Sequence, residues 1–151
     1  MALRSEFISL LNKFFILKNA KILEVGCGSG AISMDLSLRG AIYTGVDISY
    51  EAIRIAKLIA SNYNVANCEY TYGNGFNLVY PDNSYDINFN IGVLEHFSDN
   101  DIIKMLKEMA RVSKYIIVGV PYSGSQIYRL AKKFLKVIIH GSTDLKEILK
   151  L

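Results

Sequence analysis

The fold of this 151-residue chain is decided by the stretch Lys21-Ile22-Leu23-Glu24-Val25-Gly26-Cys27-Gly28-Ser29-Gly30. Its first half, residues 21–25, is a short apolar run that is typical of a buried strand. Three glycines at alternate positions follow, and residues without a Cβ allow a sharp turn and a close approach of the backbone to a ligand. Residues 31–38 then have the pattern of a helix, whose N-terminus offers unpaired N–H groups and a partial positive charge. A strand, a glycine turn and a helix in this order predict the start of a nucleotide-binding βαβ unit.

Two acidic residues accompany this turn and indicate what it binds. Glu24 stands two residues before Gly26. Asp47 closes the next apolar run, residues 41–46, about 20 residues beyond the loop, where a βαβ unit holds a ribose. The spacing G-x-G-x-G is shorter than the dinucleotide fingerprint G-x-G-x-x-G, and a carboxylate at Glu24 would repel a pyrophosphate but suits a cation. The pattern therefore favours a ligand that joins adenosine to a positive centre, as S-adenosylmethionine (SAM) does, over NAD.

Apolar periodicity predicts alternating strands and helices along the rest of the chain. Residues 5–18 have helical spacing and either cover the sheet or form a lid over the substrate. Ser49 and Ser98 are candidate N-caps of two amphipathic helices. The expected helices are residues 31–38, 50–60 and 102–112, and the expected strands are residues 21–25, 41–46, 68–72, 85–91 and 115–120. This alternation predicts one α/β domain with a mainly parallel sheet.

Four motifs, in order and with normal gaps, resemble those of class I SAM-dependent methyltransferases. They are residues 22–30, 45–49, 81–86 and 93–97, and the likeness covers roughly residues 21–121. The chain is most similar to the small-molecule, type 11-like subgroup that includes the ubiquinone and menaquinone C-methyltransferases. The resemblance implies a Rossmann-like three-layer α/β/α sandwich in which five parallel strands lie in the order 3-2-1-4-5.

The resemblance also divides residues 1–151 into the parts of a single methyltransferase domain. Residues 1–20 form an N-terminal helix, residues 21–121 the cofactor-binding core, and residues 122–151 a basic, lid-like helical segment. From the resemblance we also expect the antiparallel hairpin of strands six and seven, which completes the sheet in the family, to be missing after the fifth strand. We therefore expect the open edge of that strand to favour association with a second copy of the chain.

The methionine and ribose end of SAM is expected at the glycine loop, by the same resemblance. Glu24 would face the methionine ammonium, directly or through water, and Asp47 would hold the ribose hydroxyls. The backbone carbonyl at Asn90, near the end of the fourth strand, would lie close to the ammonium, and the Asn90 side chain is a candidate for positioning the substrate. The loop residues implied in cofactor binding are Gly26, Cys27, Gly28 and Gly30.

The adenine end is expected beside Ile48 and the turn that contains Asn74. The family commonly has an aspartate at this place, which accepts a hydrogen bond from the adenine amino group, and the amide carbonyl of Asn74 can accept the same bond. Gly75 and Phe76 would lie beside it. Alternatively, Asn74-Gly75 is a plain turn without a ligand role.

The acid–base pair nearest the expected site is Glu95-His96. A histidine can act as a general base at neutral pH, so His96 is the candidate catalytic residue. Alternatively, His96 hydrogen-bonds locally and fixes its loop. No second histidine follows at the spacing of a zinc helix, and the two cysteines, Cys27 and Cys68, form neither a metal box nor a disulfide framework, so no metal is expected.

Composition and charge exclude several other classes. The net charge of +3 is too small to predict a nucleic-acid partner. Residues 125–151 carry six Lys or Arg against two Asp or Glu, and residues 126–139 predict a basic amphipathic helix. That helix is a plain surface helix, a substrate lid, or a peripheral contact with a membrane or an anionic substrate. No run approaches the ~20 apolar residues of a membrane span, and no secretory signal is found, so a cytoplasmic location is expected.

Together these features predict an enzyme that transfers a methyl group from SAM to a small-molecule acceptor. The acceptor atom is left open between carbon, nitrogen and oxygen. One alternative is a non-catalytic SAM-binding module that acts as a partner subunit. A second is an NAD(P)-linked oxidoreductase, which the glycine spacing and Glu24 disfavour.

Overall fold

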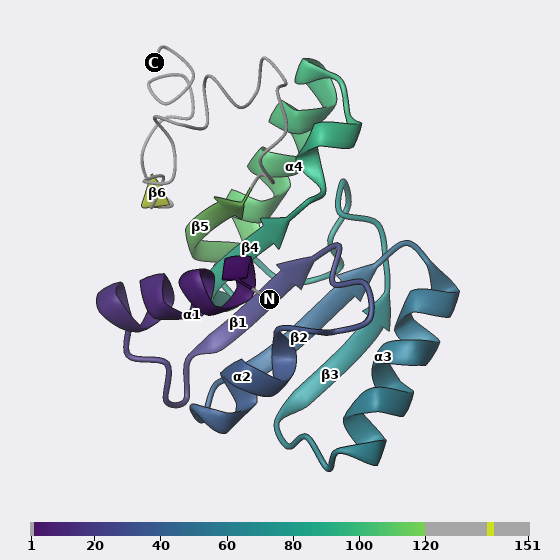
Figure 1. The fold of residues 1–151 in the computed structure, drawn as a ribbon. Helices are drawn as coiled ribbons and strands as arrows, with labels where there is room; N and C mark the ends of the chain where they lie inside the picture. Colours follow the sequence, from purple (N-terminus) through teal and green to yellow (C-terminus); the bar gives the residue numbers. More distant parts are fainter. Residues whose placement is uncertain (1, 120–138, 141–151) are drawn as a thin grey trace.

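The computed structural model describes residues 2–119 and 139–140 (Figure 1). Its helices are α1 (Ala2–Phe14), α2 (Ser33–Leu38), α3 (Tyr50–Asn62) and α4 (Asp99–Val112), with a short 3-10 helix, η1 (Leu94–His96). Its strands are β1 (Lys21–Val25), β2 (Ile42–Asp47), β3 (Cys68–Tyr72), β4 (Tyr85–Ile91), β5 (Ser113–Gly119) and β6 (Ile139–His140). Strands and helices alternate along the described part of the chain, as the periodicity predicted. No helix in that part is both long and apolar enough to cross a membrane.

The first five strands form a parallel sheet in the order β3-β2-β1-β4-β5, which confirms the expected topology. The strand order reverses at β1, which pairs with β2 on one side and with β4 on the other. In sheets of this kind the reversal leaves room for a ligand beyond the carboxyl ends of the strands. The glycine loop follows β1 at that point.

One short strand was not expected. β6 pairs antiparallel with β5, with Tyr115 opposite His140 and Ile116 opposite Ile139. The helix expected over residues 126–139 lies outside the described residues except at Ile139, where β6 shows that the prediction is wrong. At these two positions the edge of β5 is paired within the chain, which removes part of the basis for association through that edge.

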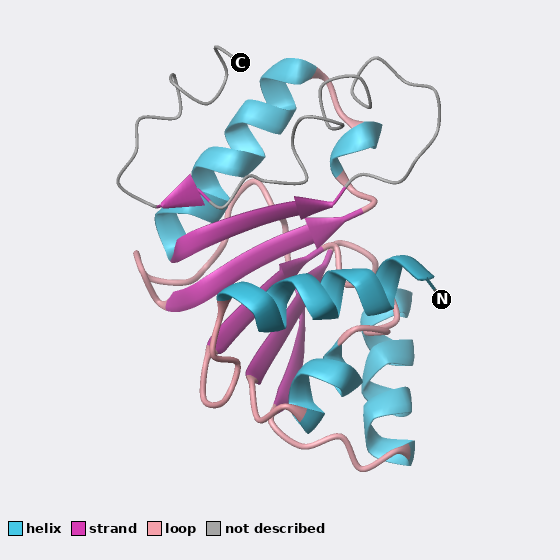
Figure 2. Ribbon diagram, turned by 60° about the vertical axis from the view of Figure 1, so that its left-hand side comes forward, coloured by secondary structure: helices cyan, strands magenta, loops and turns pink. Residues whose placement is uncertain are grey.

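Three helices cover one face of the sheet and α4 covers the other, which gives the expected three layers (Figure 2). Leu11 of α1, Leu36 of α2 and Ile53 of α3 belong to one apolar cluster with the strands. On the opposite face Met109 of α4 packs with Ile116 of β5 in a second cluster. Helix α1 therefore covers the sheet, as the simpler of its two interpretations predicted.

Local sequence signals explain where α3 and α4 begin. Ser49 caps α3 by accepting a hydrogen bond from the Ala52 N–H at 3.2 Å, and Ser98 caps α4 by accepting one from the Asp101 N–H at 3.4 Å. Helix α1 ends earlier than predicted, and the chain turns into β1 through Asn19, whose φ is 64°. Asparagine tolerates this left-handed conformation better than most residues.

Candidate functional site

A cavity of about 290 Å³ lies at the carboxyl edge of the sheet, beyond the ends of β1, β2 and β4. This is the edge where parallel sheets with a reversal of strand order bind ligands. Its lining includes these residues expected to form the site: Gly26, Asp47, Ile48, Asn74, Gly75, Phe76 and His96. The other lining residues are Val25, Val46, Gly73, Gly92, Val93, Phe97 and Met105. The expected residues outside the lining are Glu24, Cys27, Gly28, Gly30 and Asn90.

The loop after β1 needs its glycines for two separate reasons. Gly26, Gly28 and Gly30 have positive φ angles of 79°, 53° and 73°, which residues with a side chain rarely adopt. In addition, a Cβ on Gly26 would lie 2.3 Å from Val93 Cγ2, and a Cβ on Gly30 would lie 2.6 Å from the ring of Tyr70. The loop is therefore held closely between Val93 and Tyr70.

Asp47 joins the end of β2 to the glycine loop. Its Oδ2 accepts a hydrogen bond from the Gly28 N–H at 2.8 Å, and its Oδ1 accepts one from the Ser49 N–H at 2.8 Å. None of the ion pairs between described residues involves this carboxylate. Each carboxylate oxygen can accept two hydrogen bonds, so Asp47 keeps acceptor capacity for a ligand with two neighbouring donors.

Glu24 lies behind the glycine loop rather than in the cavity wall, and only 5% of it is exposed. Its Oε2 accepts a hydrogen bond from the Tyr43 hydroxyl at 2.5 Å. Burial raises the pKa of Glu24 to about 8; the Tyr43 bond opposes this rise, and the charge of Asp47 adds to it. Burial, followed by the charges of Glu24 and Asp47, raises the pKa of the Cys27 thiol to about 12, so this thiol keeps its proton at neutral pH.

Ile48 and the turn after β3 form a second wall of the cavity. The Ile48 side chain is 66% exposed, which leaves apolar surface facing solvent. Asn74 Oδ1 accepts a hydrogen bond from the Phe76 N–H at 2.9 Å, so the structure contains the turn that the sequence offered as an alternative. That oxygen has a second lone pair for a ligand. A Cβ on Gly75 would lie 2.7 Å from Val25 Cγ1, which shows how closely the turn approaches β1.

His96 enters the cavity wall from η1. Its backbone N–H donates to the Val93 carbonyl at 3.3 Å, and the residue itself is exposed. The next residue, Phe97, packs edge-on against Phe76 with the ring centroids 5.1 Å apart, and both rings line the cavity. The preceding Glu95 has a buried Oε2 without a hydrogen-bond partner. The imidazole is thus accessible and stands beside an aromatic wall.

The side chain of Asn90 is buried against α4 and does not line the cavity. The residue is fully buried, and its Nδ2 contacts Met109 Sδ of α4 at 3.3 Å. Asn88 faces the same way and donates to the Met109 carbonyl at 3.4 Å. Side chains alternate along a strand, so Ile87 and Phe89 pack on the opposite face, with α1, α2 and α3. The role expected for the Asn90 backbone carbonyl stays a prediction.

Several cavity residues were given no role from the sequence. Gly92 and Phe97 carried a signal, because Gly92 directly follows an apolar strand and Phe97 belongs to the motif at residues 93–97. Met105 carried none: helical periodicity marked it as core, and it is 3% exposed while it also lines the cavity. Among the described residues, no group of three or more His, Cys, Asp or Glu side chains is placed to hold a metal ion.

Comparisons with known proteins identify the family. The model of a methyltransferase domain matches residues 22–115, more than half of the chain. A ubiquinone biosynthesis O-methyltransferase of Pseudoalteromonas translucida is 30% identical over 155 residues, covering 98% of this chain and 64% of that protein. Another, of Bartonella tribocorum, is 34% identical over 140 residues, covering 78% and 55%. The crystal structure of YcgJ from Bacillus subtilis has a TM-score of 0.68 at 27% identity, covering 76% and 50%.

The matched region contains the features described above: β1, the glycine loop, both acidic residues and the strands up to the start of β5. The chain spans 39%, 33% and 64% of the length of three curated relatives, from Pelagibacter ubique, Rauvolfia serpentina and Pseudoalteromonas translucida. The family match and the fold agree, and the chain belongs to the methyltransferase domain family.

Proposed function

We propose that this chain binds SAM in the cavity at the carboxyl edge of the sheet and transfers its methyl group to an oxygen atom of a small-molecule acceptor. One observation carries the proposal: the Asp47 carboxylate lies between the glycine loop and the cavity and takes part in no ion pair with a described residue. A carboxylate in this place can accept hydrogen bonds from the two hydroxyls of a ribose, each worth about 1.5–3 kcal/mol.

The residues present fit a nucleoside with a positively charged tail. Ile48, Val93 and Phe76 supply apolar walls for a flat base, and the amide of Asn74 supplies a polar edge. Glu24 supplies a carboxyl group behind the loop, which would become negatively charged by releasing its proton when the cationic end binds. None of the described residues that line the cavity is Lys or Arg, so a pyrophosphate such as that of NAD would lack a cationic partner among them. The lining therefore favours SAM over a dinucleotide.

SAM supplies a methyl group already activated by its sulfonium, so the protein mainly has to align the acceptor. In this proposal His96 accepts the proton of the acceptor hydroxyl, because its imidazole is exposed in the cavity wall and histidine is the most frequent general base in enzymes. Phe76 and Phe97 form the wall beside it, which suits an acceptor with an apolar or aromatic body.

Oxygen is proposed as the acceptor atom because of the relatives. Those of Pseudoalteromonas translucida and Bartonella tribocorum are ubiquinone biosynthesis O-methyltransferases, and the first is similar to nearly the whole of this chain. An N-methyltransferase of Rauvolfia serpentina matches a shorter part of it. The O-methyl prediction is accordingly tested against an amine acceptor.

The experiment combines binding and turnover. Isothermal titration calorimetry of the purified chain should show binding of SAM and of its demethylated product, and no binding of NADH. Mass spectrometry of reactions with catechol-type phenols should then detect methyl ethers, whereas matched anilines should stay unmodified. Binding of NADH in place of SAM would refute the cofactor. Binding of SAM without turnover of any acceptor would favour a non-catalytic, SAM-binding partner subunit.

A further inference from the structure

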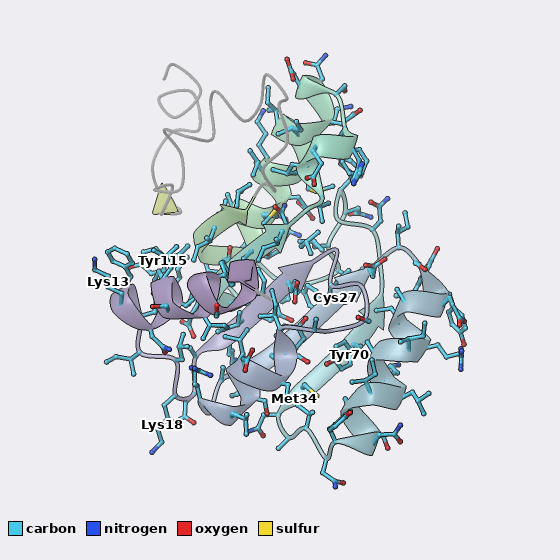
Figure 3. The ribbon with its side chains drawn as sticks, in the orientation of Figure 1. Lys13, Lys18, Cys27, Met34, Tyr70 and Tyr115 are labelled. Atoms are coloured by element: carbon cyan, nitrogen blue, oxygen red, sulfur yellow. The ribbon has the colours of Figure 1, made fainter. Side chains whose placement is uncertain are left out.

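A buried polar cluster lies beneath the glycine loop, on the sheet face covered by α1, α2 and α3. Its centre is the pair of Tyr43 and Glu24, which are 1% and 5% exposed and joined by the 2.5 Å hydrogen bond from the hydroxyl to Oε2. Cys27 of the loop and Tyr70 of β3 belong to the apolar cluster on the same face, and both are labelled in Figure 3. Because Tyr43 is sealed inside the protein, it does not contact a ligand in the cavity directly, and its hydroxyl acts on Glu24.

The strand register places this pair. β1 and β2 pair Ile22 with Tyr43 and Glu24 with Gly45. The Tyr43 hydroxyl therefore has to pass in front of Gly45 to reach the carboxylate, which is two positions further along the neighbouring strand. A Cβ on Gly45 would lie 2.9 Å from the Tyr43 hydroxyl oxygen and 2.8 Å from Cys27 Sγ. The absence of one side chain thus provides the space for the hydrogen bond.

The groups around Glu24 act on its charge in opposite directions. Burial and the charge of Asp47 raise the pKa of Glu24, and the hydrogen bond from Tyr43 lowers it. Burial holds the pKa of Tyr43 well above its usual value, so its hydroxyl stays a donor at neutral pH. The thiol of Cys27 also keeps its proton. The hydroxyl of Tyr70 is engaged with Ser33 instead of the carboxylate. Tyr43 is therefore the neighbour that favours the charged form of Glu24.

We propose that Tyr43 is a positioning residue for the cationic end of SAM: its hydroxyl holds the Glu24 carboxylate behind the glycine loop and favours the charged form that attracts the ligand. This inference rests on the proposed function. Binding of the cation would release the proton of Glu24 to solvent, so the affinity for SAM would rise with pH until Glu24 is ionised in the free protein. Loss of the Tyr43 hydroxyl would move that rise to higher pH.

The test compares Tyr43→Phe with the wild-type protein by isothermal titration calorimetry of SAM over a series of pH values. A hydrogen bond to a charged group corresponds to about one to two pH units. At about pH 7 the variant should therefore bind SAM about tenfold or more weakly than the wild type. The difference should close at alkaline pH, where Glu24 is ionised in both proteins. The titration of SAM itself cancels in this ratio, since both proteins receive the same ligand.

Tyr70→Phe is the matched control, because Tyr70 is a buried tyrosine whose ring centroid lies 5.8 Å from that of Tyr43. Its affinity ratio to the wild type should not change with pH. A pH-independent ratio for Tyr43→Phe as well would overturn the inference. If the wild type fails to bind SAM, the proposed function fails. The effect of Tyr43 on Glu24 is then tested by urea unfolding of the free protein at a series of pH values. The fall in urea stability with rising pH ends near the folded-state pKa of Glu24, so in Tyr43→Phe it should extend about one unit higher. No shift would overturn it.

Discussion

Two aspartates at opposite edges of the same sheet perform the same local task with different surroundings. At the amino edge Asp86 accepts a hydrogen bond from the Lys21 N–H at 2.9 Å, and at the carboxyl edge Asp47 accepts one from the Gly28 N–H at 2.8 Å. Asp86 is also paired with Lys114 at 2.7 Å. Asp47 has no such partner among the described residues and faces a cavity.

The difference separates a structural carboxylate from one that is available to a ligand. Burial tends to raise the pKa of Asp86, but the hydrogen bonds from Lys114 and the Lys21 N–H bring it below its usual value. At the carboxyl edge the acids Glu24 and Asp47 lie close enough to raise the pKa of Glu24, with no described Lys or Arg paired to either. Two neighbouring acids without a cationic partner among the described residues suit a cationic ligand.

Alanine substitutions of two glycines, one at each edge of the sheet, should differ most in their effects on stability and on SAM binding. Gly26 and Gly40 have nearly equal φ angles of 79° and 78°, so an alanine would strain both backbones by about 1–2 kcal/mol. A Cβ on Gly26 would also lie 2.3 Å from Val93 Cγ2, whereas one on Gly40 would lie 3.4 Å from the flexible side chain of Lys18. Overpacking costs about 1–3 kcal/mol more.

Gly26→Ala should therefore lower the free energy of unfolding by about 2–5 kcal/mol and abolish SAM binding. Gly40→Ala should lower the free energy of unfolding only by the cost of the backbone strain, and its affinity for SAM should be unchanged. Urea unfolding and calorimetry measure both effects. The double variant of Gly26→Ala with Val93→Ala should recover part of the loss, and equal losses for the two single glycine variants would contradict the role given to Val93.

The two aspartates themselves come next. Asp47→Ala should weaken SAM binding at least about tenfold, because it removes charge-assisted hydrogen bonds to the ribose. Asp86→Ala removes an equivalent carboxylate and a backbone hydrogen bond at the far edge, so it should lower stability and leave the affinity unchanged. Calorimetry of both variants, with their unfolding curves as a control, decides the point. Equal affinities would show that the ligand lies elsewhere.

Much of this difference between the two sheet edges could be predicted from the sequence, because it depends on short local patterns of residues. The glycine spacing and the two acids placed the loop at the carboxyl edge, and Asp47, Ile48 and Gly75 do line the cavity. Strand periodicity was enough for the fold, since apolar runs such as residues 85–91 match β4.

Contacts between distant residues were beyond such patterns. The hydrogen bond from Tyr43 to Glu24 joins residues 19 positions apart, and it depends on the register of β1 with β2 and on Gly45. Asn90 shows the same limit: its place near the end of β4 was predicted, but only the alternation of the strand against α4 decides which way its side chain points.

Glu24 should make the stability of the free protein depend on pH. The folded protein holds the Glu24 proton up to about pH 8, whereas an unfolded chain releases it near 4.5. Between these values the folded state binds more protons, so the free energy of unfolding contributed by this group falls as pH rises, by at most about 1.4 kcal/mol per pH unit. Glu24→Gln cannot ionise and should lose less stability over this window while it weakens SAM binding.

Urea unfolding of both proteins at a series of pH values measures this difference, since the contributions of all other groups are common to the two curves. Parallel curves would show that Glu24 is already ionised in the folded protein. The same variant separates stability from function at the carboxyl edge. If Glu24 were retained for folding alone, replacing its carboxyl group would not raise the free energy of unfolding.

The ion pair at the amino edge should give the smallest effect. Lys114 and Asp86 have side chains that are 56% and 37% exposed, and pairs this open to solvent contribute about 0–1 kcal/mol. Lys114→Met should therefore lower the free energy of unfolding by less than about 1 kcal/mol, and the difference from the wild type should shrink as salt is added. SAM affinity should be unchanged, because the pair lies at the edge away from the cavity. A loss of affinity comparable to that of Asp47→Ala would mean that the two edges are coupled through the sheet. It would contradict the distinction between a structural carboxylate at Asp86 and a ligand-binding one at Asp47.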